Sequence, residues 1–261
     1  MMRAGVHWGL AVALSGAAAT LVTPSFGALR EVASWLVRPA VLPFAWRAVD
    51  AAQRRGDANE LFARAQQVLD WLPGWTDGHM VFAYRFALDG GQASGDQAQR
   101  ADAALRRLDI ALSWLERARA DAGPRRLPQL LQTMSFLPVL AQMQEPGLRE
   151  LLRPRGGAAA IADGYLAQAE ALTGSAAVHE QRLFFTPQLV AAMLDAGQQP
   201  LARKVLLTAI ERSADVRNRE LATEWRQRLE ELVRWLDGDP TVDLAAVRAD
   251  ERFSVLLPYL R

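Results

Sequence analysis

The sequence of 261 residues contains no cysteine and only one lysine, Lys204. Without cysteine the chain cannot form disulfides, thiolate zinc sites, iron–sulfur clusters or a cysteine nucleophile. All the other basic side chains are arginines, an excess that is typical of GC-rich coding. The 30 basic side chains balance 29 acidic ones, for a net charge of +1. This balance gives no electrostatic reason to expect nucleic acid as a partner.

Strand signals are nearly absent after residue 40. The chain instead shows stretches rich in Ala, Leu, Arg and Glu, with apolar residues every three or four positions and with Gly, Pro or Asp between them. One example is the series Leu221, Trp225, Leu229, Leu232 and Leu236. Such a stripe predicts an amphipathic helix that must pack against neighbouring helices. We therefore expect an all-α fold.

Charged residues are also missing from the 26 positions between Ala4 and Leu29, enough helix to cross a hydrocarbon layer of about 30 Å. Three structures fit this run: an uncleaved membrane anchor, a cleaved signal peptide, or a buried helix of a soluble protein. We favour the anchor, because a charged, Trp-containing segment follows at 30–41. Arginines on both sides of the run leave its orientation open, so the side of the membrane that carries the rest of the chain stays undetermined.

Small residues recur every four positions within this run. They are Gly5, Gly9, Ala13 and Ala17. On a membrane helix such a stripe allows close approach of a second helix, so it is a candidate surface for self-association.

The chain from 42 onward contains two stretches with a common layout. Leu42 to Trp75 has Gly56 at an expected turn between two helices and Pro73 at its end, and Leu183 to Val216 has Gly197 at the corresponding turn. Both stretches resemble units of the tetratricopeptide family. The N-terminal run, the first of these stretches, its corner Trp71-Leu72-Pro73-Gly74-Trp75 and the aromatic segment that follows through Phe86 resemble a group of uncharacterised bacterial membrane-anchored repeat proteins. The two stretches are not separated by a multiple of 34 residues, so the array is irregular.

The resemblance implies an all-α, irregular tetratricopeptide-like array of helical hairpins, that is, an α-solenoid, preceded by a transmembrane or signal helix. The expected organisation is an anchor or signal segment at 1–29, a juxtamembrane connector at 30–41, a repeat domain at 42–237 and a capping tail at 238–261. In this family the first helices of successive units line a concave face. Carrying those positions across predicts a partner-binding face made of Trp46, Asp50, Gln53, Arg54, Met80 and Tyr84.

Two further expectations concern packing. The apolar stretch Leu127 to Met143 contains Pro138 and predicts a pair of buried helices rather than a second membrane span. Most tryptophans fall at helical positions or helix corners, which predicts that, apart from Trp46 on the expected partner-binding face, they fill the core. They are Trp46, Trp71, Trp75, Trp114, Trp225 and Trp235.

Motifs for catalysis are missing. The segment beginning at His179-Glu180 lacks the second histidine of a helical zinc motif, and the glycine loop at 90–96 lacks the Lys-Ser/Thr of a phosphate-binding loop. His79, beside Asp77, fits a packed side chain near a helix start better than an acid–base pair. No paired-carboxylate or nucleophile-elbow motif stands out. We predict no catalytic, cofactor or metal site.

The sequence therefore favours a non-enzymatic interaction scaffold or assembly factor, held in a bacterial membrane by a single N-terminal span through residues 4–29, that binds a partner protein. The alternatives are an envelope carrier of lipid or another hydrophobic ligand, or an accessory subunit of a membrane complex.

Overall fold

The structure, a computed structural model, describes residues 42–72, 74–89 and 95–260. All regular elements in these ranges are helices, which confirms the prediction of an all-α fold. The predicted anchor at 4–29, its small-residue stripe, the connector at 30–41, Pro73 and most of the glycine loop at 90–96 lie outside the described residues. Within those residues, no helix is both long enough and apolar enough to cross a membrane. The chain divides into two compact units, residues 1–75 and 76–261, which we call unit 1 and unit 2.

Unit 1 contains a helical hairpin. Residues 42–55 are helical, and Gly56, with φ of 68°, turns the chain toward α3 (Ala58–Trp71). Glycine suits this turn because a positive φ is strained for residues with a Cβ atom. Asp57 caps α3 by accepting a hydrogen bond from the backbone N–H of Glu60 at 2.9 Å. Apolar side chains from both helices are buried, among them Val49 and Val68.

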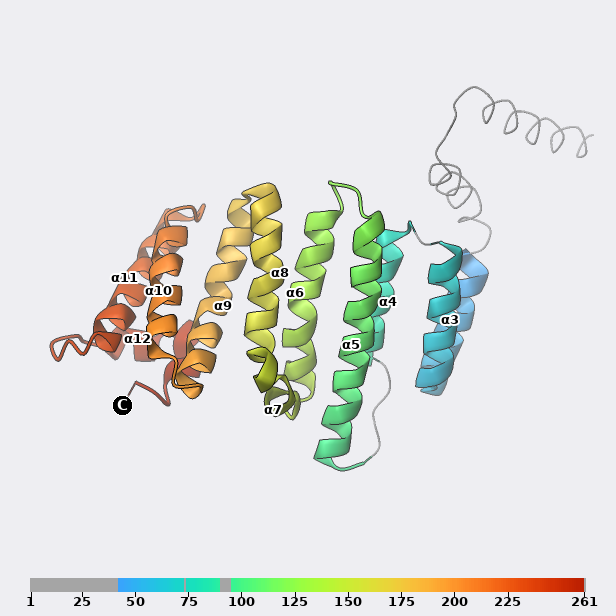
Figure 1. Cartoon of the computed structure of the whole chain (residues 1–261), viewed down its shortest axis with the longest axis horizontal. Coiled ribbons are helices and arrows are strands. Elements are labelled where there is room, and N and C mark those ends of the chain that lie inside the picture. Colours follow the sequence, from blue (N-terminus) through green and yellow to red (C-terminus); the bar gives the residue numbers. More distant parts are fainter. Residues whose placement is uncertain (1–41, 73, 90–94, 261) are drawn as a thin grey trace, which may run out of the picture. The chain divides into compact units, whose positions relative to one another are not determined.

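Unit 2 contains the remaining helices, which stand side by side in chain order in Figure 1. Its elements are α4 (Thr76–Asp89), α5 (Gln97–Asp121), α6 (Leu127–Gln144), α7 (Leu148–Leu152), η1 (Arg153–Arg155), α8 (Gly157–Thr173), α9 (Ala176–Asp195), α10 (Gln199–Ser213), α11 (Arg219–Leu236), α12 (Ala245–Ala249) and η2 (Glu251–Leu256).

The long helices of unit 2 pack in succession: α4 on α5, α5 on α6, α6 on α8, α8 on α9, α9 on α10 and α10 on α11. A second set of contacts joins alternate members of this series. Helix α4 packs on α6, the rings of Phe136 and Phe185 join α6 to α9, and those of Phe184 and Trp225 join α9 to α11. We call α4, α6, α9 and α11 the first layer of unit 2, and α5, α8 and α10 the second layer.

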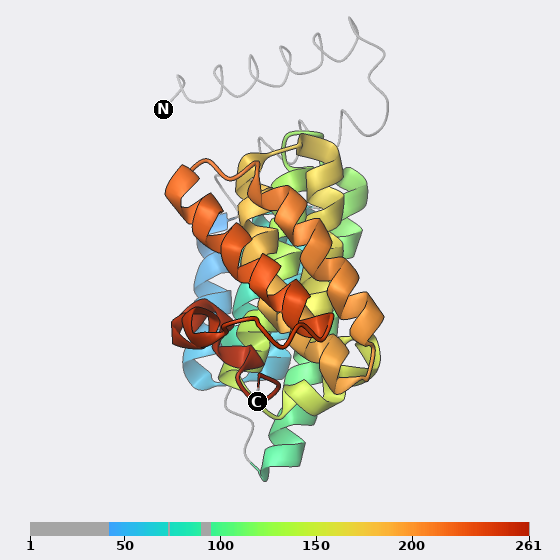
Figure 2. The same ribbon diagram turned by 90° about the vertical axis from the view of Figure 1, so that its left-hand side faces the viewer.

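The C-terminal tail closes the last hairpins of unit 2. After α11 the chain folds back, as the dark-red segment in Figure 2 shows, and η2 packs on α9. Phe253 is fully buried with its ring centroid 5.0 Å from that of Trp225, which is also buried. The tail therefore covers apolar surface that α9 and α11 would otherwise expose to water.

Helix α6 corrects the prediction of a helix pair at this place. It runs unbroken from Leu127 to Gln144 through Pro138. Proline removes one backbone hydrogen bond and crowds the preceding turn. Here the Pro138 ring is itself buried, together with Leu137 and Ala141, and we attribute the continuity of the helix to this burial on both sides of the proline. Helix α9 likewise continues through Pro187.

Tyr165 of α8 forms a hydrogen bond with Glu116 of α5, and this bond links these two helices of the second layer. Burial, aided by a hydrogen bond and the nearby charge of Glu116 of α5, raises the pKa of Tyr165 to about 12. An unfolded tyrosine ionises near pH 10. Since the folded pKa lies above the unfolded one, the stability linked to this group is complete below pH 10 and is lost as the pH rises toward 12.

We therefore expect the last tyrosine ionisation of the folded protein to disappear in Tyr165→Phe. The chain has three tyrosines, so the phases can be separated by following tyrosinate absorbance during alkaline titration. Tyr259→Phe is the matched control, because burial and the hydrogen bond to Asp195 also raise the pKa of Tyr259. If the phase near pH 12 persists in Tyr165→Phe, the assignment is wrong.

Candidate functional site

The six residues predicted to form a partner-binding face fall in both units. Trp46, Asp50, Gln53 and Arg54 lie on the helix over 42–55 of unit 1, where the first three are partly buried and Arg54 is exposed. Met80 and Tyr84 lie one turn apart on α4 of unit 2. The structure thus places these residues in two separate groups, and each group is described with its own unit.

Tyr84 belongs to a larger set of exposed aromatic side chains in unit 2. Its side chain is 45% exposed, and those of Phe136 and Phe184 are 37% and 44% exposed. Each ring comes from a different helix of the first layer: Tyr84 from α4, Phe136 from α6 and Phe184 from α9. We call these three residues the aromatic row. Exposed large aromatic residues on three neighbouring helices are a stronger signal than isolated ones, which are common on any surface.

Contacts between the helices fix the order of the row. The Thr133 hydroxyl of α6 lies 3.3 Å from the Met80 sulfur of α4. Tyr84 and Phe136 follow these two residues by one turn, so they lie at neighbouring positions on α4 and α6. The Phe136 ring lies 6.1 Å from that of Phe185, the residue after Phe184. Phe184 in turn packs edge-on against Trp225 of α11, at 5.6 Å between centroids.

Charged pairs lie on the first-layer helices or directly beside them. Asp77, seven residues and about 10 Å before Tyr84 on α4, forms an ion pair at 3.2 Å with Arg126, which immediately precedes α6. At α11, Arg252 pairs with Glu224 at 3.1 Å and its guanidinium carbon lies 5.2 Å from the centre of the Trp225 ring. An apolar centre with charged groups at its margins is the usual composition of a protein–protein interface.

Beneath this surface, charged side chains gather between α8, α9 and α10. Arg182 of α9 is buried, with 7% of its surface exposed. Around it lie carboxylates, a histidine and a second arginine. We call the six residues the ionic cluster: Asp163, Glu170, His179, Arg182, Arg212 and Asp215.

Arg182 is the centre of the ionic cluster. Its Nε and Nη2 atoms donate to the two carboxylate oxygens of Asp163, at 2.6 and 2.8 Å, while Nη1 donates to Glu170. Glu170 also forms an ion pair with Arg212, whose Nε atom lies 3.4 Å from the carboxylate. A two-pronged guanidinium–carboxylate pair has both strength and directional specificity. The cluster therefore joins α8, α9 and α10 through two carboxylates of α8.

The two arginines of the cluster respond differently to burial. Burial opposes the charge of Arg182, but hydrogen bonds and charges from Asp163 and Glu170 outweigh it and raise the pKa. For Arg212, burial and the neighbouring charge of Arg182 lower the pKa in spite of Glu170. Both guanidinium groups keep their charge at neutral pH, since their ordinary pKa lies far above it.

His179, the first residue of the incomplete zinc motif, also belongs to this cluster. Its Nε2 atom lies 3.1 Å from Glu170, and its buried Nδ1 atom lies 3.1 Å from Asp215 without the alignment of a hydrogen bond. Both Asp163 and Glu170 are already bound by Arg182. We therefore interpret the cluster as a support that fixes the first-layer helix α9, and with it Phe184, against the second layer.

The ionic cluster was not predicted from the sequence, although the sequence contains a pattern of charged residues that indicates it. Asp163 and Glu170 interrupt an otherwise apolar, alanine-rich stretch and are seven residues apart, hence on one helix face. His179 and Arg182 follow three residues apart on the next helix. Carboxylates on the apolar face of one helix and cations on the next are a pattern that predicts a buried ion pair.

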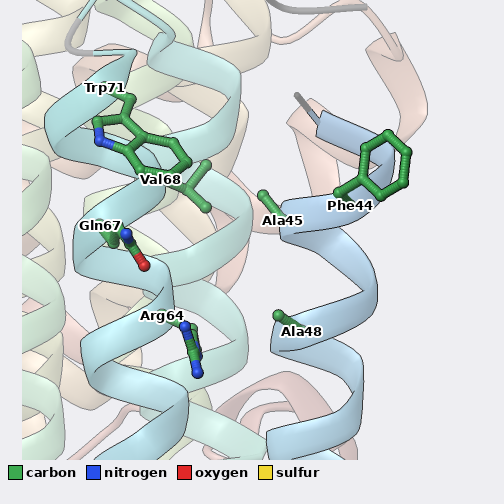
Figure 3. A pocket seen from close by; sticks show the side chains of 7 residues that line it. All are labelled: Phe44, Ala45, Ala48, Arg64, Gln67, Val68 and Trp71. Atoms are coloured by element: carbon green, nitrogen blue, oxygen red, sulfur yellow. The ribbon is translucent and has the colours of Figure 1, made fainter. Parts of the chain in front are cut away.

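Unit 1 contains a groove of about 310 Å³ between the helix over 42–55 and α3, shown in Figure 3. Its walls are mostly apolar, with one guanidinium and one amide. The lining residues are Phe44, Ala45, Ala48, Arg64, Gln67, Val68 and Trp71. Trp71 is 55% exposed, so the prediction that it fills the core is wrong. It is the last residue of α3, where neighbouring helices cover less of a side chain, whereas Trp114 and Trp225 lie in mid-helix and are buried.

Within the ranges that the structure describes, no group of three or more histidine and acidic side chains is arranged to hold a metal ion. No family model matches the chain, and neither a curated protein nor a solved structure matches it.

Proposed function

We propose that this chain is a membrane-anchored, non-enzymatic scaffold or assembly factor that binds a partner protein across the aromatic row of unit 2. The observation that carries the proposal is the row itself: three large rings, each at least 37% exposed, on three successive helices of one layer. Aromatic side chains of this kind dominate the energy of protein–protein recognition. The charged pairs Asp77–Arg126 and Glu224–Arg252, at the margins of the first layer, add specificity and orientation.

The spacing of the row favours a helical partner segment. Packed helix axes are about 8–10 Å apart, and a helix advances about 10 Å in seven residues. A partner helix laid across α4, α6 and α9 can therefore place an apolar side chain on each ring when its apolar residues recur every seven positions. The partner that we propose is such an amphipathic helix.

The membrane part of the proposal is supported by the sequence. The uncharged run at 4–29 is long enough to span a bilayer, and the resemblance to membrane-anchored repeat proteins favours a bacterial membrane. A single span of this kind keeps both units close to the membrane while the aromatic row of unit 2 recruits the partner.

Photo-crosslinking in native membranes tests the partner face. A photoreactive residue replaces Gln188, which is exposed one turn after Phe184 on α9, and the control replaces Lys204, which is exposed on α10 of the second layer. We expect an adduct of defined mass from position 188 and none from position 204. Mass spectrometry of the adduct should map the contact to an apolar-faced helix, and Tyr84→Ser should abolish it.

Three results would overturn the proposal: no adduct at either position, equal adducts at both, or a crosslinked segment without an apolar helix face. A lipid adduct at position 188 would instead indicate the carrier alternative. Each variant is exposed at the substituted position, so loss of folding is readily excluded by circular dichroism.

A further inference from the structure

The groove of unit 1 has an aromatic end. Phe44 is 71% exposed and Trp71 is 55% exposed, which makes them the two most exposed aromatic side chains among the residues that the structure describes. Figure 3 shows both rings at one end of the hairpin, with Arg64 further along the groove. Phe44 lies near the start of the helix over 42–55 and Trp71 at the end of α3, so the antiparallel hairpin brings the two rings to the same end.

This aromatic end is also the end at which the chain arrives from the N-terminal segment. The uncharged run ends at Leu29, and residue 42 follows 13 positions later. A fully extended chain spans at most about 3.6 Å per residue, so the helix over 42–55 begins within about 50 Å of the end of that run. If residues 4–29 span a bilayer, the aromatic end of unit 1 is tethered within about 50 Å of the bilayer surface and can reach it.

The chemistry of this end suits the interfacial layer of a bilayer. Tryptophan concentrates at the level of the lipid headgroups, where its ring is in contact with both apolar chains and water. Phenylalanine accompanies tryptophan on the apolar faces of helices that lie in this layer. The long side chain of Arg64, which lines the same groove, can place its methylene groups on the apolar surface and its guanidinium among the headgroups. Two exposed side chains near these rings in sequence, Arg47 and Asp70, carry opposite charges. Contact between the aromatic end and a bilayer therefore does not require anionic lipid.

We infer that the aromatic end of unit 1 rests on the membrane, with the rings of Phe44 and Trp71 inserted into the interfacial layer of the bilayer that holds residues 4–29. The inference rests on the proposed membrane anchor and adds a second contact to it. Two contacts restrict the tilt of unit 1 on the membrane more than a flexible tether does, because the second one binds at the high effective concentration set by the tether.

The absence of cysteine makes a direct test practical, since any introduced cysteine is unique. The full chain is reconstituted into phosphatidylcholine vesicles as Gln67→Cys or as Asn59→Cys, each labelled with an environment-sensitive fluorophore. Both residues are exposed on α3, but Gln67 lines the groove near its aromatic end and Asn59 is two turns away, about 12 Å along the helix. Spin-labelled lipid carrying its nitroxide near the headgroup is the quencher.

We expect the lipid quencher to reduce the fluorescence at position 67 at least about twice as strongly as at position 59. When Phe44→Ser and Trp71→Ser are added, the lipid quencher should reduce the fluorescence at positions 67 and 59 equally, while the chain still floats with the vesicles. Both rings are exposed, so these substitutions leave the buried side of the hairpin intact.

The outcomes separate the two proposals. A chain that floats with vesicles but shows equal quenching at both positions overturns the membrane contact of unit 1 and leaves the anchor in place. Protection of position 67 from aqueous iodide without quenching by the lipid also overturns the contact, because a protein then covers the groove. A chain that does not float with vesicles overturns the anchor of the proposed function itself.

Discussion

Replacing Arg182 by methionine should lower the free energy of unfolding of unit 2 by about 3 kcal/mol. Methionine keeps an unbranched apolar stem like that of arginine but lacks the guanidinium. It provides no donors for Asp163 and Glu170, which are mostly buried. Glu170 keeps Arg212 and His179 as neighbours, but Asp163 loses the guanidinium that binds both of its oxygens, and a mostly buried carboxylate without that partner carries a large desolvation penalty.

Arg155→Met is the matched control for this prediction. Arg155 also makes a two-pronged pair, with Asp109 at 2.5 and 3.0 Å, but both side chains are more than 40% exposed. Water then solvates the carboxylate that is left behind, and salt screens the original pair, so the loss should stay below about 1 kcal/mol. Equal losses in the two variants would show that burial does not govern the strength of the ionic cluster.

The measurement should resolve the two units. The chain divides into two compact units, and units of this kind can unfold in separate transitions. A single free energy of unfolding for the whole chain would then combine the stabilities of the two units. Hydrogen exchange of the amides in α8, α9 and α10 reports on the region of the cluster directly. Arg182→Met combined with Asp163→Leu should recover part of the loss, since an apolar pair replaces an unmatched charge.

The helical character of the fold was predictable from the sequence because it depends on local periodicity. The 3–4-residue spacing of Trp225, Leu229 and Leu232 defines the buried face of α11 wherever that helix lies. Predictions from local sequence, such as a helix break at a proline, failed where burial in the tertiary structure outweighs the local preference. Pro138 does not end α6, because residues on both sides of it are buried in unit 2.

The candidate site was predictable only in part for the same reason. Tyr84 could be placed on a first-helix surface from a resemblance to repeat proteins. Phe136 and Phe184 could not, because their exposure depends on the register between α6 and α9, which a periodic pattern does not encode. Arg182 was missed because its partners, Asp163 and Glu170, lie on another helix.

Truncating the rings of the aromatic row should weaken partner binding by at least about 30-fold, equivalent to about 2 kcal/mol, for either Tyr84→Ser or Phe184→Ser. Each substitution removes a large ring from the proposed interface and leaves a short polar side chain opposite an apolar side chain of the partner helix. Phe184→Leu should fall between Phe184→Ser and the native chain, because leucine keeps apolar area but loses the edge of the ring.

Leu172→Ser is the matched control for these variants. Leu172 is 55% exposed and thus at least as accessible as the rings of the row, but it lies on α8 of the second layer. Affinities are measured by fluorescence anisotropy with the partner segment that crosslinking identifies, prepared as a labelled peptide. Phe184 also packs on Trp225, so the melting of each variant is recorded alongside. If Leu172→Ser weakens binding as much as Tyr84→Ser and Phe184→Ser do, or if Tyr84→Ser binds with the native affinity, the partner binds another surface of the chain.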